Sequence, residues 1–137
     1  MDVISHAVAG ASVGSAFGRP VLGAVFGVIP DVVLGIHRKA APNIGYDFTH
    51  SLAFVLVVAL VCVTLLGTWV PVLAVLSHIL LDLPTHGLKW APPLLYPLSR
   101  KRYSFGNTEW EWFNYTWWRG LAITILWCSI CLIYASR

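Results

Sequence analysis

At 137 residues with a formal net charge of +3, the chain is short enough to form one domain and nearly balanced in charge. Apolar residues make up 58% of it and charged residues 11%, against about 25% in a typical soluble domain. With a mean hydropathy of +0.74, these values exclude an ordinary soluble domain and predict a single membrane-embedded helical domain over residues 1–137. Nucleic-acid binding is not expected, because no basic face with interleaved aromatic residues is present.

Two short apolar segments, 3–17 and 21–36, open the chain. Glycines recur at every fourth position in both: Gly10, Gly14 and Gly18 in the first, Gly23 and Gly27 in the second. This spacing of small residues lets two helices approach closely, so we expect a tight hairpin, or alternatively a homo-oligomer formed through the same glycines. No cleavable signal peptide is expected, since the first residues lack a basic stretch.

Three further apolar segments follow, at 49–66, 72–83 and 119–134. A polar loop over 35–48 precedes the first of them, and Asp47 or Thr49 is expected to cap it. A long loop rich in proline and tryptophan precedes the last, and its aromatic residues are typical of a membrane interface. The predicted fold is therefore an all-α polytopic bundle of about five membrane-embedded helices.

The basic residues predict an orientation for this bundle. If all five segments cross the membrane, one side carries Arg38, Lys39, Lys89, Arg100, Lys101, Arg102 and Arg119, and the other carries Arg19 and Arg137. The side richer in lysine and arginine is normally cytoplasmic. We therefore expect an integral membrane protein with this side in the cytoplasm.

Five polar residues lie within or beside the apolar segments, each near its end on the predicted cytoplasmic side: His6, Asp31, His50, His78 and Asp82. Residues four apart share a helix face, so His78 and Asp82 point the same way. Such groups are costly in an apolar medium unless they are paired or bind a metal. Imidazoles and carboxylates gathered at one depth are typical metal ligands. We predict that all five bind a divalent metal, zinc foremost, with manganese or iron also compatible.

The number of ligands bears on the chemistry. One zinc ion takes four ligands, and a catalytic zinc reserves one of these positions for water. Five ligands therefore favour two ions with one carboxylate bridging them, an arrangement that suits phosphoester hydrolysis. His86 follows the fourth segment and is interpreted as a further ligand, a general acid or a simple loop histidine. Asp47 is interpreted either as a cap or as an acceptor for the ring N–H of His50.

Several short motifs carry a resemblance. They are Ser5-His6, Pro30-Asp31, Phe48-Thr49-His50-Ser51-Leu52, Leu76-Ser77-His78-Ile79-Leu80-Leu81-Asp82 with Thr85 and Gly87, and Leu94-Leu95-Tyr96-Pro97. Over about residues 5 to 100 the chain resembles the YdjM-like family of inner-membrane metal-dependent hydrolases. The resemblance implies that Thr49, Ser77 and Thr85 lie beside the ligands and support them.

The order His, Asp, His, His-x-x-x-Asp is also similar, more loosely, to that of zinc phospholipase C and P1-type nucleases. This likeness implies that the same five residues are ligands, that Asp82 bridges two ions, and that a phosphoester is cleaved. The expected activity is hydrolysis of a phosphoester in a lipid or membrane-associated substrate, with Asp82 and His86 as the catalytic residues. Two alternatives stay open: a transporter or ion relay that uses the His/Asp cluster, and a non-catalytic membrane protein with a structural metal.

Overall fold

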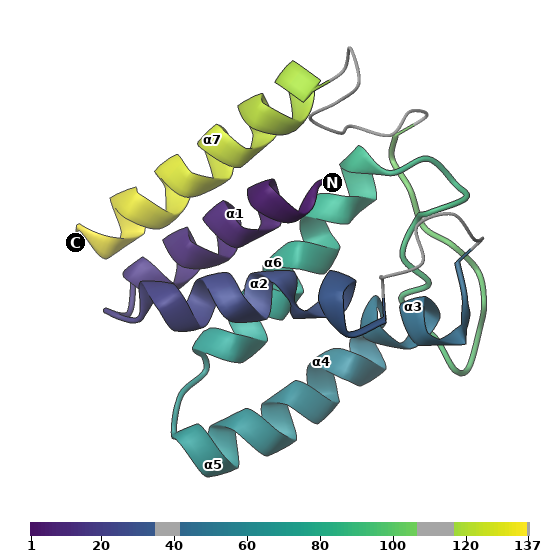
Figure 1. Cartoon of the computed structure of the whole chain (residues 1–137), viewed down its shortest axis with the longest axis horizontal. Coiled ribbons are helices and arrows are strands. Elements are labelled where there is room, and N and C mark those ends of the chain that lie inside the picture. Colours follow the sequence, from purple (N-terminus) through teal and green to yellow (C-terminus); the bar gives the residue numbers. More distant parts are fainter. Residues whose placement is uncertain (35–41, 107–116, 137) are drawn as a thin grey trace.

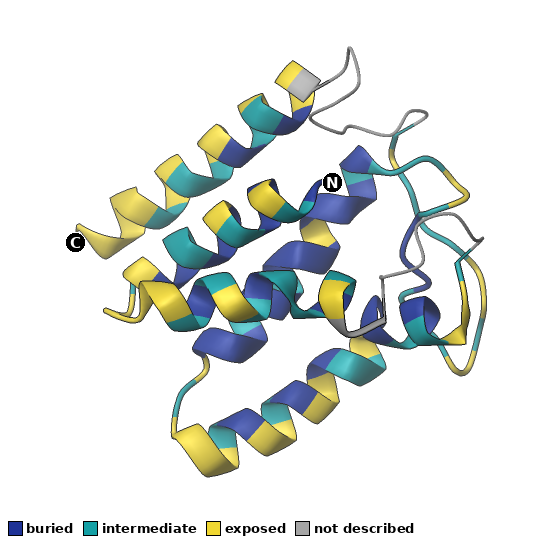
Figure 2. Cartoon of the chain, in the orientation of Figure 1, coloured by how far each residue is buried: buried dark blue, intermediate teal, exposed yellow. Residues whose placement is uncertain are grey.

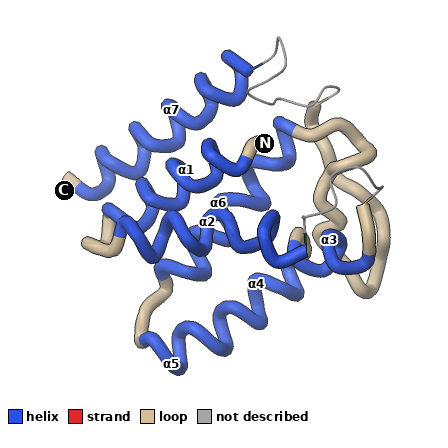
Figure 3. Tube along the Cα trace, viewed as in Figure 1, coloured by secondary structure: helices blue, strands red, loops and turns tan. Residues whose placement is uncertain are grey.

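The computed structural model describes residues 1–34, 42–106 and 117–136, and within these ranges every regular element is a helix (Figure 3). The elements are α1 (Val3–Ser15), α2 (Pro20–Leu34), α3 (Ile44–Thr49), α4 (Leu52–Val58), the π-helical turn η1 (Ala59–Val63), α5 (Thr64–Leu66), α6 (Val70–Thr85) and α7 (Trp117–Ala135). The predicted all-α fold is confirmed.

Helices α1 and α2 pack with their backbones in direct contact. A Cβ added at Gly10 would lie 2.3 Å from the carbonyl oxygen of Gly23, and one added at Gly27 would lie 2.5 Å from that of His6. The turn between the helices contains Gly18 at a φ of 67°, a left-handed conformation that favours glycine. The predicted tight hairpin is therefore confirmed, and the glycine faces are used within the chain.

Helix α6 lies at the centre of the structure. Its valine and isoleucine side chains pack against α4 and η1 in a cluster formed by Val55, Val58, Cys62, Val72, Val75 and Ile79. On its other side it packs against α1 and α2, and α7 covers α1. Figure 2 shows buried residues concentrated on α6 and exposed residues along the outer faces of α4 and α7.

The predicted boundaries of the third and fourth segments are wrong. The chain turns at His50 between α3 and α4, so the third segment does not begin as one helix at residue 49. The side chain of Asn43 caps α3 and that of Ser51 caps α4, in place of Asp47 or Thr49. Helix α6 is longer than 72–83, because proline is tolerated in a first helical turn and Pro71 stands there.

Within the described residues, one helix is long and apolar enough to cross a membrane, over Trp118–Ala135. The other apolar helices have between 13 and 16 residues, which is about 20–24 Å at a rise of 1.5 Å per residue. This is shorter than a hydrocarbon core of about 30 Å. The end of the predicted second segment and most of the interfacial aromatic residues (Trp110, Trp112, Phe113 and Tyr115) lie outside the described ranges.

The chain runs back and forth through the bundle (Figure 1). Helices α1 and α7 lie side by side and run in the same direction. Four helix ends lie toward the same end of the structure: the start of α1, the end of α2, the start of α4 and the end of α6. The candidate ligands lie on or next to these parts of the helices.

Candidate metal centre

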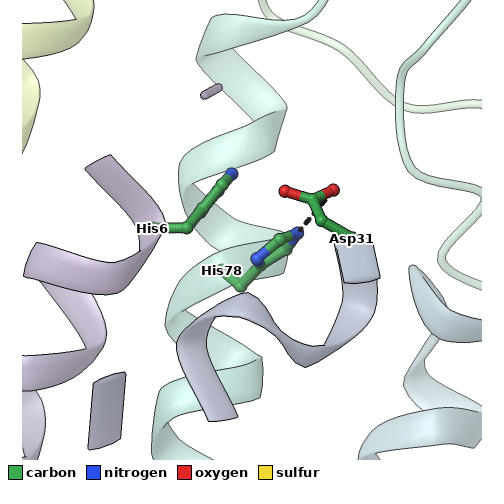
Figure 4. A group of neighbouring side chains, drawn as sticks. All are labelled: His6, Asp31 and His78. Atoms are coloured by element: carbon green, nitrogen blue, oxygen red, sulfur yellow. Dashed lines mark ion pairs between the residues drawn. The ribbon is translucent and has the colours of Figure 1, made fainter. Parts of the chain in front are cut away.

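The structure brings together all five residues predicted as metal ligands. Two overlapping groups have ligand atoms close enough to hold an ion: His6, Asp31 and His78, and His50, His78 and Asp82. Figure 4 shows the first group, with His6 on α1, Asp31 on α2 and His78 on α6 directed toward one another. The side chains of His6, His50, His78 and Asp82 are fully buried, whereas that of Asp31 is 23% exposed. The centre is therefore accessible on its Asp31 side.

Backbone carbonyls fix the tautomers of two of the histidines. His78 Nδ1 lies 2.7 Å from the carbonyl oxygen of Gly27, and His50 Nδ1 lies 3.0 Å from that of Tyr46. A carbonyl oxygen only accepts hydrogen bonds, so each Nδ1 must carry the proton and donate it. In the neutral rings, each Nε2 then offers a lone pair to the centre, as a metal ligand requires.

The donor atoms of His50, His78 and Asp82 lie at about the spacing of a tetrahedral site, and a carboxylate oxygen of Asp31 lies beside the two nitrogens. His50 Nε2 and His78 Nε2 are 3.2 Å apart. Asp82 Oδ2 is 3.6 and 3.2 Å from these two nitrogens, and Asp31 Oδ1 is 3.5 and 3.8 Å from them. A tetrahedral ion with ligands at about 2.0–2.1 Å separates them by about 3.4 Å. Two lone pairs that face each other at this distance repel unless a metal ion or a proton lies between them.

The second carboxylate oxygen of Asp82 faces a different set of donors. His6 Nε2 donates to Oδ1 over 3.0 Å, and His86 Nδ1 lies 3.0 Å from the same oxygen. The α-amino group of Met1 donates to it over 2.8 Å. His86 is 13% exposed, so it forms a second accessible edge. Asp82 thus lies between two sets of nitrogen atoms, and the Met1 ammonium supplies the positive charge beside Oδ1 in this structure.

Unsatisfied buried atoms support a fit to metal. Among the described residues, Asp82 Oδ2 and His6 Nδ1 are buried and lack a hydrogen-bond partner. Buried polar atoms without partners are rare in folded proteins and call for an ion or water. The residues present therefore fit a divalent cation.

The predicted supporting residues divide into two kinds. Thr49 Oγ1 donates to the carbonyl oxygen of Pro30 over 3.0 Å and lies 3.1 Å from His50 Nδ1, so it joins two ligand-bearing segments. Ser77 and Thr85 donate to carbonyl oxygens of their own helix. The carboxylate of Asp47 pairs with Arg102, and the acceptor at His50 Nδ1 is the Tyr46 carbonyl.

Besides Met1, whose α-amino group contacts Asp82, two residues beside the ligands are not among those predicted from the sequence. Gly27 contributes the carbonyl that orients His78, and Tyr46 stacks on His50 with ring centroids 3.8 Å apart. Tyr46 stands four residues before His50, a spacing that places two side chains on one helix face. Gly27 belongs to the glycine repeat, whose spacing indicates close packing but not an acceptor.

The geometry can be set beside the comparisons with known proteins. No curated protein and no solved structure matches the chain. A family described as YdjM inner membrane protein matches it over residues 1–137. The match covers every ligand-bearing helix and agrees with the family expected from the sequence motifs. The chain belongs to the YdjM inner membrane protein family.

Proposed function

We propose that the protein is a membrane-embedded, metal-dependent hydrolase that cleaves a phosphoester of a lipid or membrane-associated substrate. The observation that carries the proposal is the buried centre of three histidines and two aspartates, open at Asp31. Five donors shared between two ions leave each ion fewer than four protein ligands, so a position remains for water. A closed structural site would have none.

When bound, the metal lowers the pKa of water and stabilises negative charge on phosphate oxygens. The residues of the chain provide the rest. Asp82 presents one oxygen to His50 and His78 and the other to His6 and His86. His86 lies at an exposed edge, where it can donate a proton to the leaving oxygen. The buried helices around the centre limit access by bulk water.

The alternative of an ion relay requires polar groups that continue away from the centre. The two threonine hydroxyls along α5 and α7 do not provide such a path. Thr64 Oγ1 donates to the carbonyl oxygens of Leu60 and Val61. Thr124 Oγ1 donates to that of Gly120 within its own helix and also lies 3.5 Å from the thioether sulfur of Met1, a weak acceptor. These bonds to nearby carbonyl oxygens do not lead away from the centre, which favours a hydrolase over an ion relay.

We further propose that all five apolar segments are embedded and that the centre faces the cytoplasm. The loop after α6 begins at the end where the ligands lie and carries the exposed residues Lys89, Arg100 and Lys101, which favours a cytoplasmic position. A cysteine introduced by Leu98→Cys, at a 93% exposed position, should react with a membrane-impermeant reagent only in inside-out vesicles. Reaction in right-side-out vesicles would contradict this orientation.

The hydrolase proposal is tested with protein stripped of metal, reloaded with zinc or manganese, and supplied with phospholipids and lipid phosphomonoesters in nanodiscs. We expect a cleaved product by mass spectrometry with the wild type and none with Asp82→Asn. Stoichiometric metal without any turnover across this panel would contradict the proposed activity. Turnover that Asp82→Asn retains would place the reaction elsewhere.

A further inference from the structure

Helix α3 supports the metal centre, but it is too short to be stable alone. It has six residues, and its Asn43 cap accepts a hydrogen bond from Tyr46 N over 2.9 Å. Isolated helices of this length do not persist in water, and they depend on tertiary contacts. The contacts that hold α3 therefore decide where its residues lie relative to His50, the residue that follows it.

Arg102 provides the main polar contact between α3 and the loop after α6. Its Nη2 donates to Asp47 Oδ1 over 2.5 Å, and its Nη1 donates to the carbonyl oxygen of Ala91 over 2.9 Å. The Arg102 side chain is 22% exposed and that of Asp47 is 9% exposed. Because the guanidinium fork is planar and rigid, these bonds fix the direction of α3 as well as its distance from the loop.

Tyr46 connects this contact to the metal ligand. The Arg102 guanidinium lies 5.9 Å from the centre of the Tyr46 ring. The same ring stacks on the His50 ring at an interplanar angle of 18°. The Tyr46 backbone carbonyl accepts a hydrogen bond from His50 Nδ1. The Tyr46 hydroxyl donates to the carbonyl oxygen of Trp90. Burial raises the pKa of this hydroxyl, so it remains a donor.

We propose that Arg102 is a positioning residue for the metal centre, because it holds α3 so that Tyr46 orients the His50 ring. The inference rests on the metal binding in the proposed function, but it assigns a role to a loop residue that touches no ligand. It differs from a purely structural role, in which Arg102 only neutralises the buried carboxylate of Asp47. In that case, removing both charges together would restore the site.

The test is a titration of the metal-free full chain in detergent with Co²⁺, read from the visible absorption of the bound ion. Arg102→Gln should weaken Co²⁺ binding about ten- to hundredfold, the usual effect of losing a contact outside the ligands themselves. Its absorption band should also shift, since His50 is reoriented. Arg100→Gln, at an exposed position two residues away, is the matched control and should bind within about twofold of wild type.

The double variant Asp47→Asn/Arg102→Gln distinguishes a positioning role of Arg102 from simple neutralisation of Asp47. It also replaces the single variant in the titration if Arg102→Gln does not fold. We expect it to regain the thermal stability of the metal-free protein and to keep the weakened Co²⁺ binding and shifted band. Wild-type affinity and spectrum in the double variant, or in a folded Arg102→Gln, would overturn the inference alone. If the wild type binds no Co²⁺, the metal centre itself is wrong, and both proposals fall together.

Discussion

Two helix interfaces hold the candidate centre, and they are built from different atoms. Between α1 and α2, backbone lies against backbone, with Gly27 placed against the carbonyl oxygen of His6. Between α4 and α6, valine side chains such as Val58 and Val75 interlock. A side-chain interface relaxes partly when a methyl group is lost. A backbone interface has no side chain that can move aside when a methyl group is added.

The difference matters because Gly27 contacts two candidate ligands. Its α-carbon faces His6, and its carbonyl oxygen accepts the proton of His78. The valine contacts lie farther along α4 and involve no ligand. We infer that the α1–α2 interface sets ligand geometry, whereas the α4–α6 interface supplies stability.

The largest expected effect comes from α6, which packs against α4 and also against α1 and α2. His78→Ala removes the donor shared by the two ligand groups, so we expect metal binding to fall below detection. Metal content by plasma mass spectrometry after dialysis checks this, with Leu80→Ala as a control on the same helix, because Leu80 is exposed. If His78→Ala retains stoichiometric metal, the metal does not bind at this position on α6.

The second effect distinguishes the two interfaces directly. In Gly27→Ala, the added Cβ would lie 2.5 Å from the His6 carbonyl oxygen and 3.0 Å from Gly10 Cα, so the helices must separate. We expect about 1–3 kcal/mol of destabilisation, as for other overpacked sites, together with roughly a hundredfold loss of metal affinity because His6 and His78 both shift. Isothermal titration with Zn²⁺ and thermal unfolding measure the two effects.

Val58→Ala is the counterpart in the other interface. Loss of two buried methyl groups should destabilise the protein by roughly 2 kcal/mol and leave Zn²⁺ affinity within about twofold of wild type, since Val58 packs in a cluster of apolar side chains. If Val58→Ala weakens Zn²⁺ binding as much as Gly27→Ala does, the contrast between the interfaces is wrong.

A smaller effect is expected where α3 meets α2. Thr49→Val removes the hydrogen bond to the Pro30 carbonyl, next to Asp31, and should weaken Zn²⁺ binding about tenfold. Ser77→Ala removes only a bond within α6 and should leave the affinity unchanged. Equal affinities for the two variants would show that the α2–α3 contact does not support the site.

Much of the arrangement could be predicted from the sequence. The spacing of His78 and Asp82 places both on one helix face, and alternating segments bring His6, Asp31 and His50 to the same end. The glycine repeat likewise predicts the α1–α2 hairpin. These inferences succeed because helical periodicity and segment order are local properties.

The remaining features depend on contacts between distant parts of the chain. Arg102 reaches Asp47 across 55 positions, and Gly27 meets His78 across 51. No local pattern indicates either pair. The break at His50 is also not predictable, because a serine such as Ser51 can occupy a segment start without capping a helix. Its role as the cap of α4 is evident only in the structure.

The central claim is that His50, His78 and Asp82, with Asp31 beside them, hold a divalent ion. Anomalous diffraction from crystals of the metal-loaded protein tests it most directly. We predict a peak about 2.0–2.2 Å from the Nε2 atoms of His50 and His78 and a carboxylate oxygen of Asp82, with a second peak near His6 if two ions bind. Well-ordered crystals with no peak among these side chains, or with a peak elsewhere, would contradict the account.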